Sequence, residues 1–170
     1  ETLVEAIGGR PGFYGPNPIA YLSLLARRPA LTIGDLDEAL VTDRLLLRAG
    51  AFRGSLFLLH VEDYPTYFRA LHAIMQDGGR ATLDAAGIGA DKLRRCTDNV
   101  KHANFSGSLS QEQLSDIMFP GKEKRPAPDI ERLLLRKLCD AGLLVRTQSK
   151  GWKGNQFLYA RMDSWLPQIY

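Results

Sequence analysis

The segment 128–142 has the hydrophobic spacing of an amphipathic helix. Its apolar positions form one stripe at 3.6 residues per turn: Ile130, Leu133, Leu134, Leu138 and Ala141. Arg132 and Arg136, four residues apart, are therefore expected to project together from the opposite side. Asp129 suits the first turn of a helix, and Gly142 stands where a glycine commonly ends one. We predict a basic amphipathic helix here.

Two strand-like segments follow, 143–149 and 156–161, both rich in Leu, Val, Thr, Phe and Tyr. Between them lies a basic turn that contains two glycines, Lys150-Gly151-Trp152-Lys153-Gly154-Asn155. A helix followed by a hairpin with a basic tip is the element order of a winged helix-turn-helix module. Such a module places its second helix in the DNA major groove, and its wing contacts the backbone or the minor groove. The pattern therefore predicts a DNA-binding module in this part of the chain.

Further helices and a strand are predicted along the rest of the chain. The predicted helices cover 2–7, 18–28, 33–40, 63–76, 82–86 and 90–102, and a strand covers 55–61. Thr32 can cap the third helix. Ser110 and Gln113 make a capping box for one more helix, which ends near Phe119. The glycines at 87–89 mark the predicted boundary between two units.

Two short motifs of the first half recur in the second. Leu31-Thr32, Leu36 and Leu40 correspond to Leu109-Ser110, Leu114 and Met118. Arg53-Gly54-Ser55-Leu56-Phe57-Leu58 corresponds to Lys153-Gly154-Asn155-Gln156-Phe157-Leu158. The separations of the two pairs differ, so the halves are not an identical repeat. We predict an α+β fold, mostly helical, made of tandem winged helix-turn-helix units over residues 1–87 and 88–170.

Positive charge is concentrated around the predicted C-terminal module. The 170-residue chain has a net charge of +3, 45% hydrophobic and 24% charged residues, which is ordinary for a globular protein. Between Gly121 and Arg161 ten Lys or Arg face four Asp or Glu, so the rest of the chain is net negative. A basic block on a near-neutral body suits an anionic partner. A solvated charged face is the alternative.

Nine basic or aromatic residues are the candidates for DNA contact. The arginines can reach phosphates or base edges, because a guanidinium can grip guanine with two hydrogen bonds. The tryptophan, flanked by two lysines, either stacks on a sugar or base or folds back onto the sheet. For the candidates in the first half, ordinary surface charge is the alternative. The nine are Arg44, Arg48, Arg53, Arg132, Arg136, Lys137, Lys150, Trp152 and Lys153.

The sequence gives little sign of metal or nucleophilic chemistry. Cys96 and Cys139 are too few for a disulfide framework and fall in predicted helices, where buried thiols are usual. The three histidines are far apart, and the chain has no phosphate loop, nucleophile elbow or dinucleotide fingerprint. We therefore expect no metal and no cofactor. No apolar run is long enough for a membrane span and no signal peptide is visible, which fits a cytoplasmic protein.

Several short motifs along the chain, taken together, are similar to those of a known family. They are Leu31-Thr32 through Leu40, Arg44-Leu45, Phe52-Arg53-Gly54-Ser55-Leu56, Glu62-Asp63, Ala141-Gly142-Leu143-Leu144-Val145-Arg146 and Trp165-Leu166-Pro167. With this set the chain resembles the bacterial winged-helix DNA glycosylases of the AlkZ/YcaQ type. The resemblance covers most of the chain and implies tandem winged helices in a longer parent protein. It also implies removal of alkylated bases from DNA, including the unhooking of crosslinks.

The resemblance does not extend to the catalytic motif of that family. There, a glutamine-x-glutamine or glutamine-x-aspartate pair before an acidic residue and a proline positions a water and stabilises a cationic sugar. The matching stretch here is Tyr14-Gly15-Pro16-Asn17-Pro18, which has neither glutamine, although Asn17 could position a water. Phe57 stands where family members carry a histidine. We therefore assign no catalytic residue.

Three functions remain open from the sequence. The first is a tandem winged-helix protein that binds double-stranded DNA, damaged or intact, and is related to those glycosylases with or without their activity. The second is an active glycosylase that removes alkylated bases. The third is a winged-helix module for protein interaction or transcriptional regulation.

Overall fold

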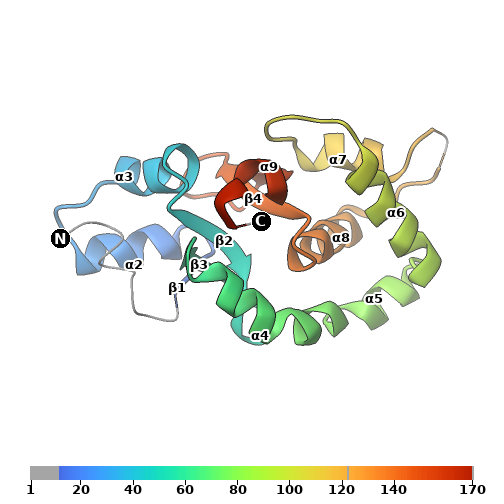
Figure 1. Ribbon diagram of the computed structural model, residues 1–170, viewed down its shortest axis with the longest axis horizontal. Helices are drawn as coiled ribbons and strands as arrows, with labels where there is room; N and C mark the ends of the chain where they lie inside the picture. Colours follow the sequence, from blue (N-terminus) through green and yellow to red (C-terminus); the bar gives the residue numbers. More distant parts are fainter. Residues whose placement is uncertain (1–11, 122, 170) are drawn as a thin grey trace.

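The computed structural model describes residues 12–121 and 123–169, which form helices around one antiparallel sheet (Figure 1). The predicted helix over 2–7 lies outside the described residues. The strands are β1 (Phe13–Tyr14), β2 (Leu46–Gly50), β3 (Leu56–His60), β4 (Leu144–Ser149) and β5 (Phe157–Arg161). The α-helices are α2 (Ile19–Arg27), α3 (Ile33–Asp37), α4 (Tyr64–Asp77), α5 (Arg80–Ala85), α6 (Ala90–His102), α7 (Gln111–Met118), α8 (Pro128–Asp140) and α9 (Met162–Trp165). A π-helix (Glu38–Thr42) and 3-10 turns (Phe52–Gly54, Pro167–Ile169) complete the description.

The sheet joins the two halves of the chain. Its strand order is β1-β3-β2-β4-β5, so β2 of the first half pairs with β4 of the second. In that pairing Arg48 lies opposite Arg146. The expected mixture of helices and strands is confirmed. The tandem winged-helix arrangement and the division at residue 87 remain predictions.

Helices cover both faces of this sheet. One face carries two hydrophobic cores side by side: Leu46 and Leu58 pack under α2 and α3, and Leu144 and Tyr159 pack under α6, α7 and α8. On the opposite face β2, β3, β4 and β5 contribute to a third core with residues of α4 and α9. Figure 1 shows α2 and α3 at one end of the molecule and α5 to α7 at the other, with the sheet between them.

Local sequence signals fix the ends of several helices. Thr32 and Ser110 each accept a hydrogen bond from the backbone N–H three residues on, in the reciprocal arrangement of a capping box. The predicted helix over 90–102 is confirmed at its ends. The predicted helix over 33–40 is shorter as an α-helix, because the chain continues as the π-helix after Asp37.

Gly142 ends α8 in a left-handed conformation that a side chain would strain. Its φ is +72°, and its N–H donates to the carbonyl oxygen of Cys139. A Cβ at this position would lie 3.2 Å from the ring of Phe68, which reaches over from α4. Gly87 ends α5 with a similar φ of +74°, but a Cβ there would meet open space. The two glycines are a matched pair.

We expect Gly142→Ala to cost more stability than Gly87→Ala. Backbone strain alone costs about 1 kcal/mol in the left-handed region, and the crowding against Phe68 should bring the loss at Gly142 to about 2 kcal/mol. Urea denaturation of both variants measures the difference in the free energy of unfolding. Equal losses would show that α4 yields to the added methyl group.

Candidate nucleic-acid interface

A groove lies where the start of α7, the outer side of α8 and the β4–β5 hairpin meet. Its volume is about 300 Å³. Arg132 of α8 and Lys150 of the hairpin both line it, and both side chains are exposed. Glu112 of α7 adds one acidic group. The remaining lining residues are Ser110, Gln111, Asn155, Gln156, Phe157, Leu158 and Tyr159.

Arg136 continues this basic side of α8 toward the first half of the chain. It stands one helical turn after Arg132, and its guanidinium contacts Gly54 in the turn between β2 and β3. Its Nε lies 3.5 Å from a carboxylate oxygen of Asp140, and its side chain remains 37% exposed. Arg53, at the tip of that turn, is exposed and has a φ of 53°. The turn that carries Arg53 thus lies beside Arg136. Arg136 in turn lies beside Arg132, which lines the groove.

Arg48 and Lys137 do not lie on the surface of the protein, so their prediction as direct DNA contacts is wrong. Arg48 is 2% exposed, and its guanidinium donates to Asn17 Oδ1 and to the hydroxyl of Tyr21, each at 3.3 Å. Lys137 is 3% exposed, and its ammonium donates to the carbonyl oxygens of Met75 (2.8 Å) and Gln76 (2.6 Å). Both cations are held by groups of the protein interior.

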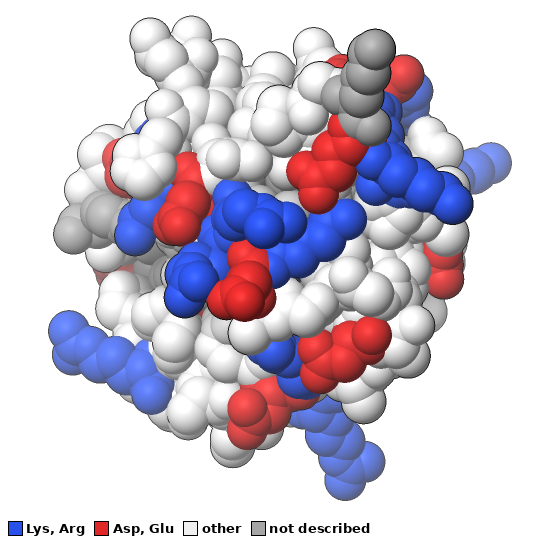
Figure 2. All heavy atoms as spheres, turned by 90° about the vertical axis from the view of Figure 1, so that its right-hand side faces the viewer, with Lys and Arg blue, Asp and Glu red and all other residues white. Residues whose placement is uncertain are grey.

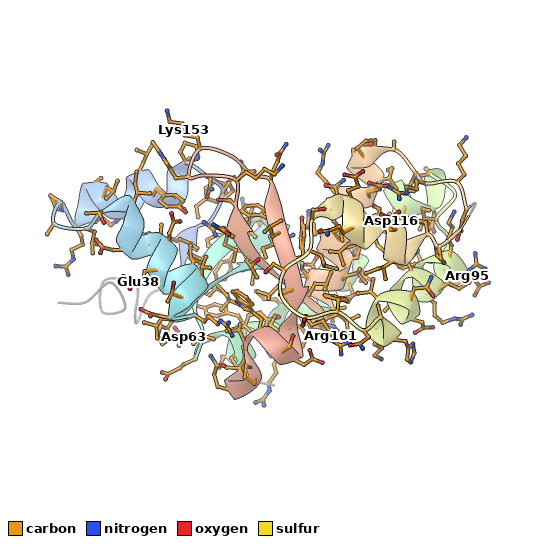
Figure 3. The ribbon with its side chains drawn as sticks, turned by 90° about the horizontal axis from the view of Figure 1, so that it is seen from above. Glu38, Asp63, Arg95, Asp116, Lys153 and Arg161 are labelled. Atoms are coloured by element: carbon orange, nitrogen blue, oxygen red, sulfur yellow. The ribbon has the colours of Figure 1, made fainter. Side chains whose placement is uncertain are left out.

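Two further candidates have partners within the protein. Trp152 packs against the core beneath α2, with its ring centroid 6.2 Å from that of Tyr21. The guanidinium of Arg44 lies 4.0 Å from the ring centroid of Trp165, and its Nη1 donates to the carbonyl oxygen of the same residue at 3.0 Å. Lys153 is exposed at the periphery of the molecule, as Figure 3 shows. Its ammonium lies 5.3 Å from the centroid of the Trp152 ring.

Asn17 fastens the hairpin to the first half of the chain. It is 4% exposed, and its Nδ2 donates to Ser149 Oγ (3.0 Å) and to the carbonyl oxygen of Gly154 (2.8 Å). A reciprocal pair joins it to Asn155: the Asn17 N–H donates to Asn155 Oδ1 at 2.8 Å, and Asn155 Nδ2 donates to the Asn17 carbonyl at 3.1 Å. With Arg48 on its Oδ1, the amide of Asn17 is occupied on both sides. Asn17 therefore links the hairpin to the first half of the chain.

Basic residues on the α5–α7 side of the molecule are arranged differently. Figure 2 shows Lys and Arg interspersed with Asp and Glu on that face. Lys92 lies 3.2 Å from Glu123, Arg94 lies 2.8 Å from Asp91, and Arg125 pairs with Asp116. Within the described ranges, neither Arg132 nor Lys150 forms an ion pair. The groove is therefore a better candidate for an anionic partner than this mixed face.

The structure also shows the state of the two cysteines and whether side chains group as metal ligands. Both cysteines are buried and free, as expected, and burial raises the pKa of each thiol to about 11, which disfavours the reactive thiolate. Across residues 12–121 and 123–169, no three His, Cys, Asp or Glu side chains group so as to hold a metal ion. Among those same residues, no helix is long and apolar enough to cross a membrane.

The sequence did not indicate that Asn155 and Gln156 line the groove. It also did not indicate that Asn17 links the hairpin to the first half of the chain by hydrogen bonds. Asn155 follows a glycine in a predicted turn, which signals only a loop. Its pairing with Asn17 joins residues 138 positions apart, so no local pattern could reveal it.

Comparisons with known proteins find one matching family and two proteins that are similar over part of their length. The family described as DNA glycosylase AlkZ-like matches residues 14–170. Among solved structures, the Streptomyces sahachiroi DNA glycosylase AlkZ is similar with a TM-score of 0.66 and 19% identity, over 89% of this chain and 41% of that one. The tRNA-specific 2-thiouridylase MnmA of Lysinibacillus sphaericus is 35% identical over 85 residues, which is 49% of this chain and 21% of that protein. The chain thus spans less than half the length of either relative.

We expect Asn17→Ala to destabilise the protein by about 3 kcal/mol, because alanine cannot make the side-chain hydrogen bonds to Arg48, Ser149 and Gly154. Chemical denaturation measures the loss, and hydrogen exchange of residues 149–156 reports whether the hairpin loosens. Asn104→Ala is the control, since Asn104 is exposed in a loop. Similar behaviour of the two variants would mean that Asn17 does not fasten the hairpin.

Proposed function

The chain belongs to the AlkZ-like family of DNA glycosylases, and on that premise we propose that it binds double-stranded DNA through the groove between α7, α8 and the β4–β5 hairpin. The observation that carries the proposal is the meeting of Arg132 and Lys150 in one groove, both exposed and without an acidic partner among the described residues. Cations placed in this way suit the phosphates of a DNA strand. A cytoplasmic location belongs to the same proposal.

In this proposal α8 faces the DNA as the recognition helix and the β4–β5 hairpin acts as the wing. Arg132 and Arg136 lie on the outer side of α8, and Lys150 and Lys153 lie in the hairpin turn. Asn17 contributes indirectly, since it holds the turn against the first half of the chain. The tandem winged-helix organisation, with units over 1–87 and 88–170, is part of the same hypothesis.

We further propose that the chain binds DNA without excising bases. The stretch that matches the catalytic motif of the family has no glutamine, and the amide of Asn17 is occupied by Arg48, Ser149 and Gly154. Phe57, at the position of a family histidine, contacts the rings of Tyr14 and Phe52 and has no polar group to offer. An active glycosylase is the second candidate, favoured by family membership. A protein-interaction module is the third.

Replacing both groove cations should weaken duplex binding and make it less dependent on salt. For Arg132→Ala combined with Lys150→Ala we expect about a tenfold loss of affinity near 0.1 M salt. The plot of log affinity against log salt should become about two units less steep, because two phosphate contacts are removed. Fluorescence anisotropy with a labelled duplex over a range of salt measures both quantities.

Arg94→Ala is the control for this experiment, since Arg94 is exposed on α6 and paired with Asp91. It should leave the affinity and the salt slope within twofold of the unchanged protein. Duplex binding that ignores the double replacement would overturn the groove as the DNA site. Absence of binding at low salt, together with a stable complex with another protein, would favour the interaction module.

The proposed lack of excision predicts no release of 7-methylguanine from methylated duplex. Chromatography of the supernatant measures the released base, and methylated DNA incubated in buffer alone gives the uncatalysed background. We expect release to equal this background at protein concentrations that saturate the duplex. Release above the background, with turnover, would establish the active glycosylase instead.

A further inference from the structure

An aromatic patch lies at the edge of the sheet, away from the groove. It consists of Tyr14, Phe52, Phe57 and Tyr67. The ring centroids of Phe52 lie 5.4 Å from Phe57 and 5.9 Å from Tyr67, and Tyr14 lies 6.1 Å from Phe57. The three contacts have interplanar angles of 79° to 89°, which is edge-to-face packing. The patch is therefore a connected set of rings rather than isolated side chains.

The outer rings of the patch are open to solvent. Tyr14 is 45% exposed and Phe52 is 41% exposed, whereas Phe57 and Tyr67 are half-buried against the core of the opposite sheet face. An exposed group of large apolar rings beside charged residues commonly marks a binding surface. Their packing on Phe57 and Tyr67 leaves them little freedom to lose when a ligand binds.

Cations connect this patch with the groove. Arg53 follows Phe52 directly at the tip of the β2–β3 turn, and it is exposed with the left-handed φ of 53°. A bulky residue in that conformation costs stability, and such outliers cluster at functional sites. Arg136 contacts Gly54 in the same turn and stands one helical turn from Arg132 in the groove. A DNA strand bound at the groove thus has positive charge along its way to the patch.

We propose that the aromatic patch stacks an unpaired nucleobase of the bound DNA. The inference rests on the proposed DNA binding and adds the class of substrate, a duplex with a bulged or unpaired nucleotide. A base inside an intact duplex has both faces covered by its neighbours, so only an unpaired base offers a free face to Tyr14 or Phe52. Every base has such a face, so stacking on aromatic rings tolerates any sequence. The phosphates beside the base lie near Arg53 and Arg136.

The test compares a fully paired duplex with one that carries a single bulged 2-aminopurine. The unchanged protein should bind the bulged duplex about tenfold more tightly and should quench the 2-aminopurine fluorescence on binding, as stacking does. Phe52→Ala should reduce the preference to less than threefold and remove most of the quenching. Affinity for the paired duplex should stay within twofold.

Two further variants separate stacking from folding. Phe52→Leu retains apolar packing on Phe57 and Tyr67 but has no ring, so it should lose the quenching as Phe52→Ala does. Ile74→Ala is the control, since Ile74 is 71% exposed on α4 and lies outside the patch. It should leave both preference and quenching unchanged. Thermal denaturation of all variants checks that they are folded.

The outcomes distinguish this inference from the proposed function. If the unchanged protein binds both duplexes equally and quenches nothing, stacking is overturned and DNA binding stands. Quenching that persists in Phe52→Leu and in Tyr14→Ala also overturns the patch as the site. If neither duplex is bound at low salt, the proposed function fails and this inference fails with it.

Discussion

The burial of the Arg48 guanidinium is the constraint on which the arrangement of the two halves depends. Arg48 lies opposite Arg146 where strands of the two halves pair, between the two cores of one sheet face. A buried cation is costly unless nearby groups compensate it. Tyr21 and Asn17 accept hydrogen bonds from Arg48, and its guanidinium lies 5.3 Å from the centroid of the Phe157 ring. Burial lowers the pKa of Arg48, and Tyr21 opposes that shift. These partners come from both halves, so the cation requires both to be in place.

The same principle ties α8 to α4. The ammonium of Lys137 is bound by carbonyl oxygens of the last turn of α4, where a helix end favours positive charge. Burial lowers the pKa of Lys137, and it raises the pKa of the neighbouring Asp140 carboxyl, which Arg136 partly offsets. Lys137 thus fixes α8 against α4, and Asn17 fixes the hairpin against the first half of the chain. The outer side of α8, which carries Arg132, is therefore fixed relative to the hairpin. The geometry of the groove therefore follows from polar contacts that lie beneath it.

Local patterns predicted most of the helices and three of the strands, but they missed β1, β2 and α9 and did not show which way the charged side chains point. The stripe of α8, the cap at Thr32, the capping box at Ser110 and the glycine at 142 depend on residues within one or two turns, and all are present. Arg48 stands in a strand buried on both faces, so no alternation of polar and apolar residues indicates where it points. Lys137 directly follows Arg136, and only the position of α4 decides that one cation is enclosed and the other remains partly exposed. Contacts between distant segments therefore set the site, and a single sequence does not reveal them.

Because some cations of the basic block around α8 are buried or paired with acidic residues, only part of the block could contact DNA. Of its positive residues, Lys137 and Arg146 interact with groups inside the protein. Arg125 and Arg161 form ion pairs with Asp116 and Asp163. The outward set that could meet phosphates is smaller and includes Arg132, Arg136, Lys150 and Lys153. An interface with so few cations gains only moderate affinity from charge. Shape complementarity and base stacking must then supply the remaining affinity. The exposed rings of Tyr14 and Phe52 lie next to the last of these cations and could provide the stacking.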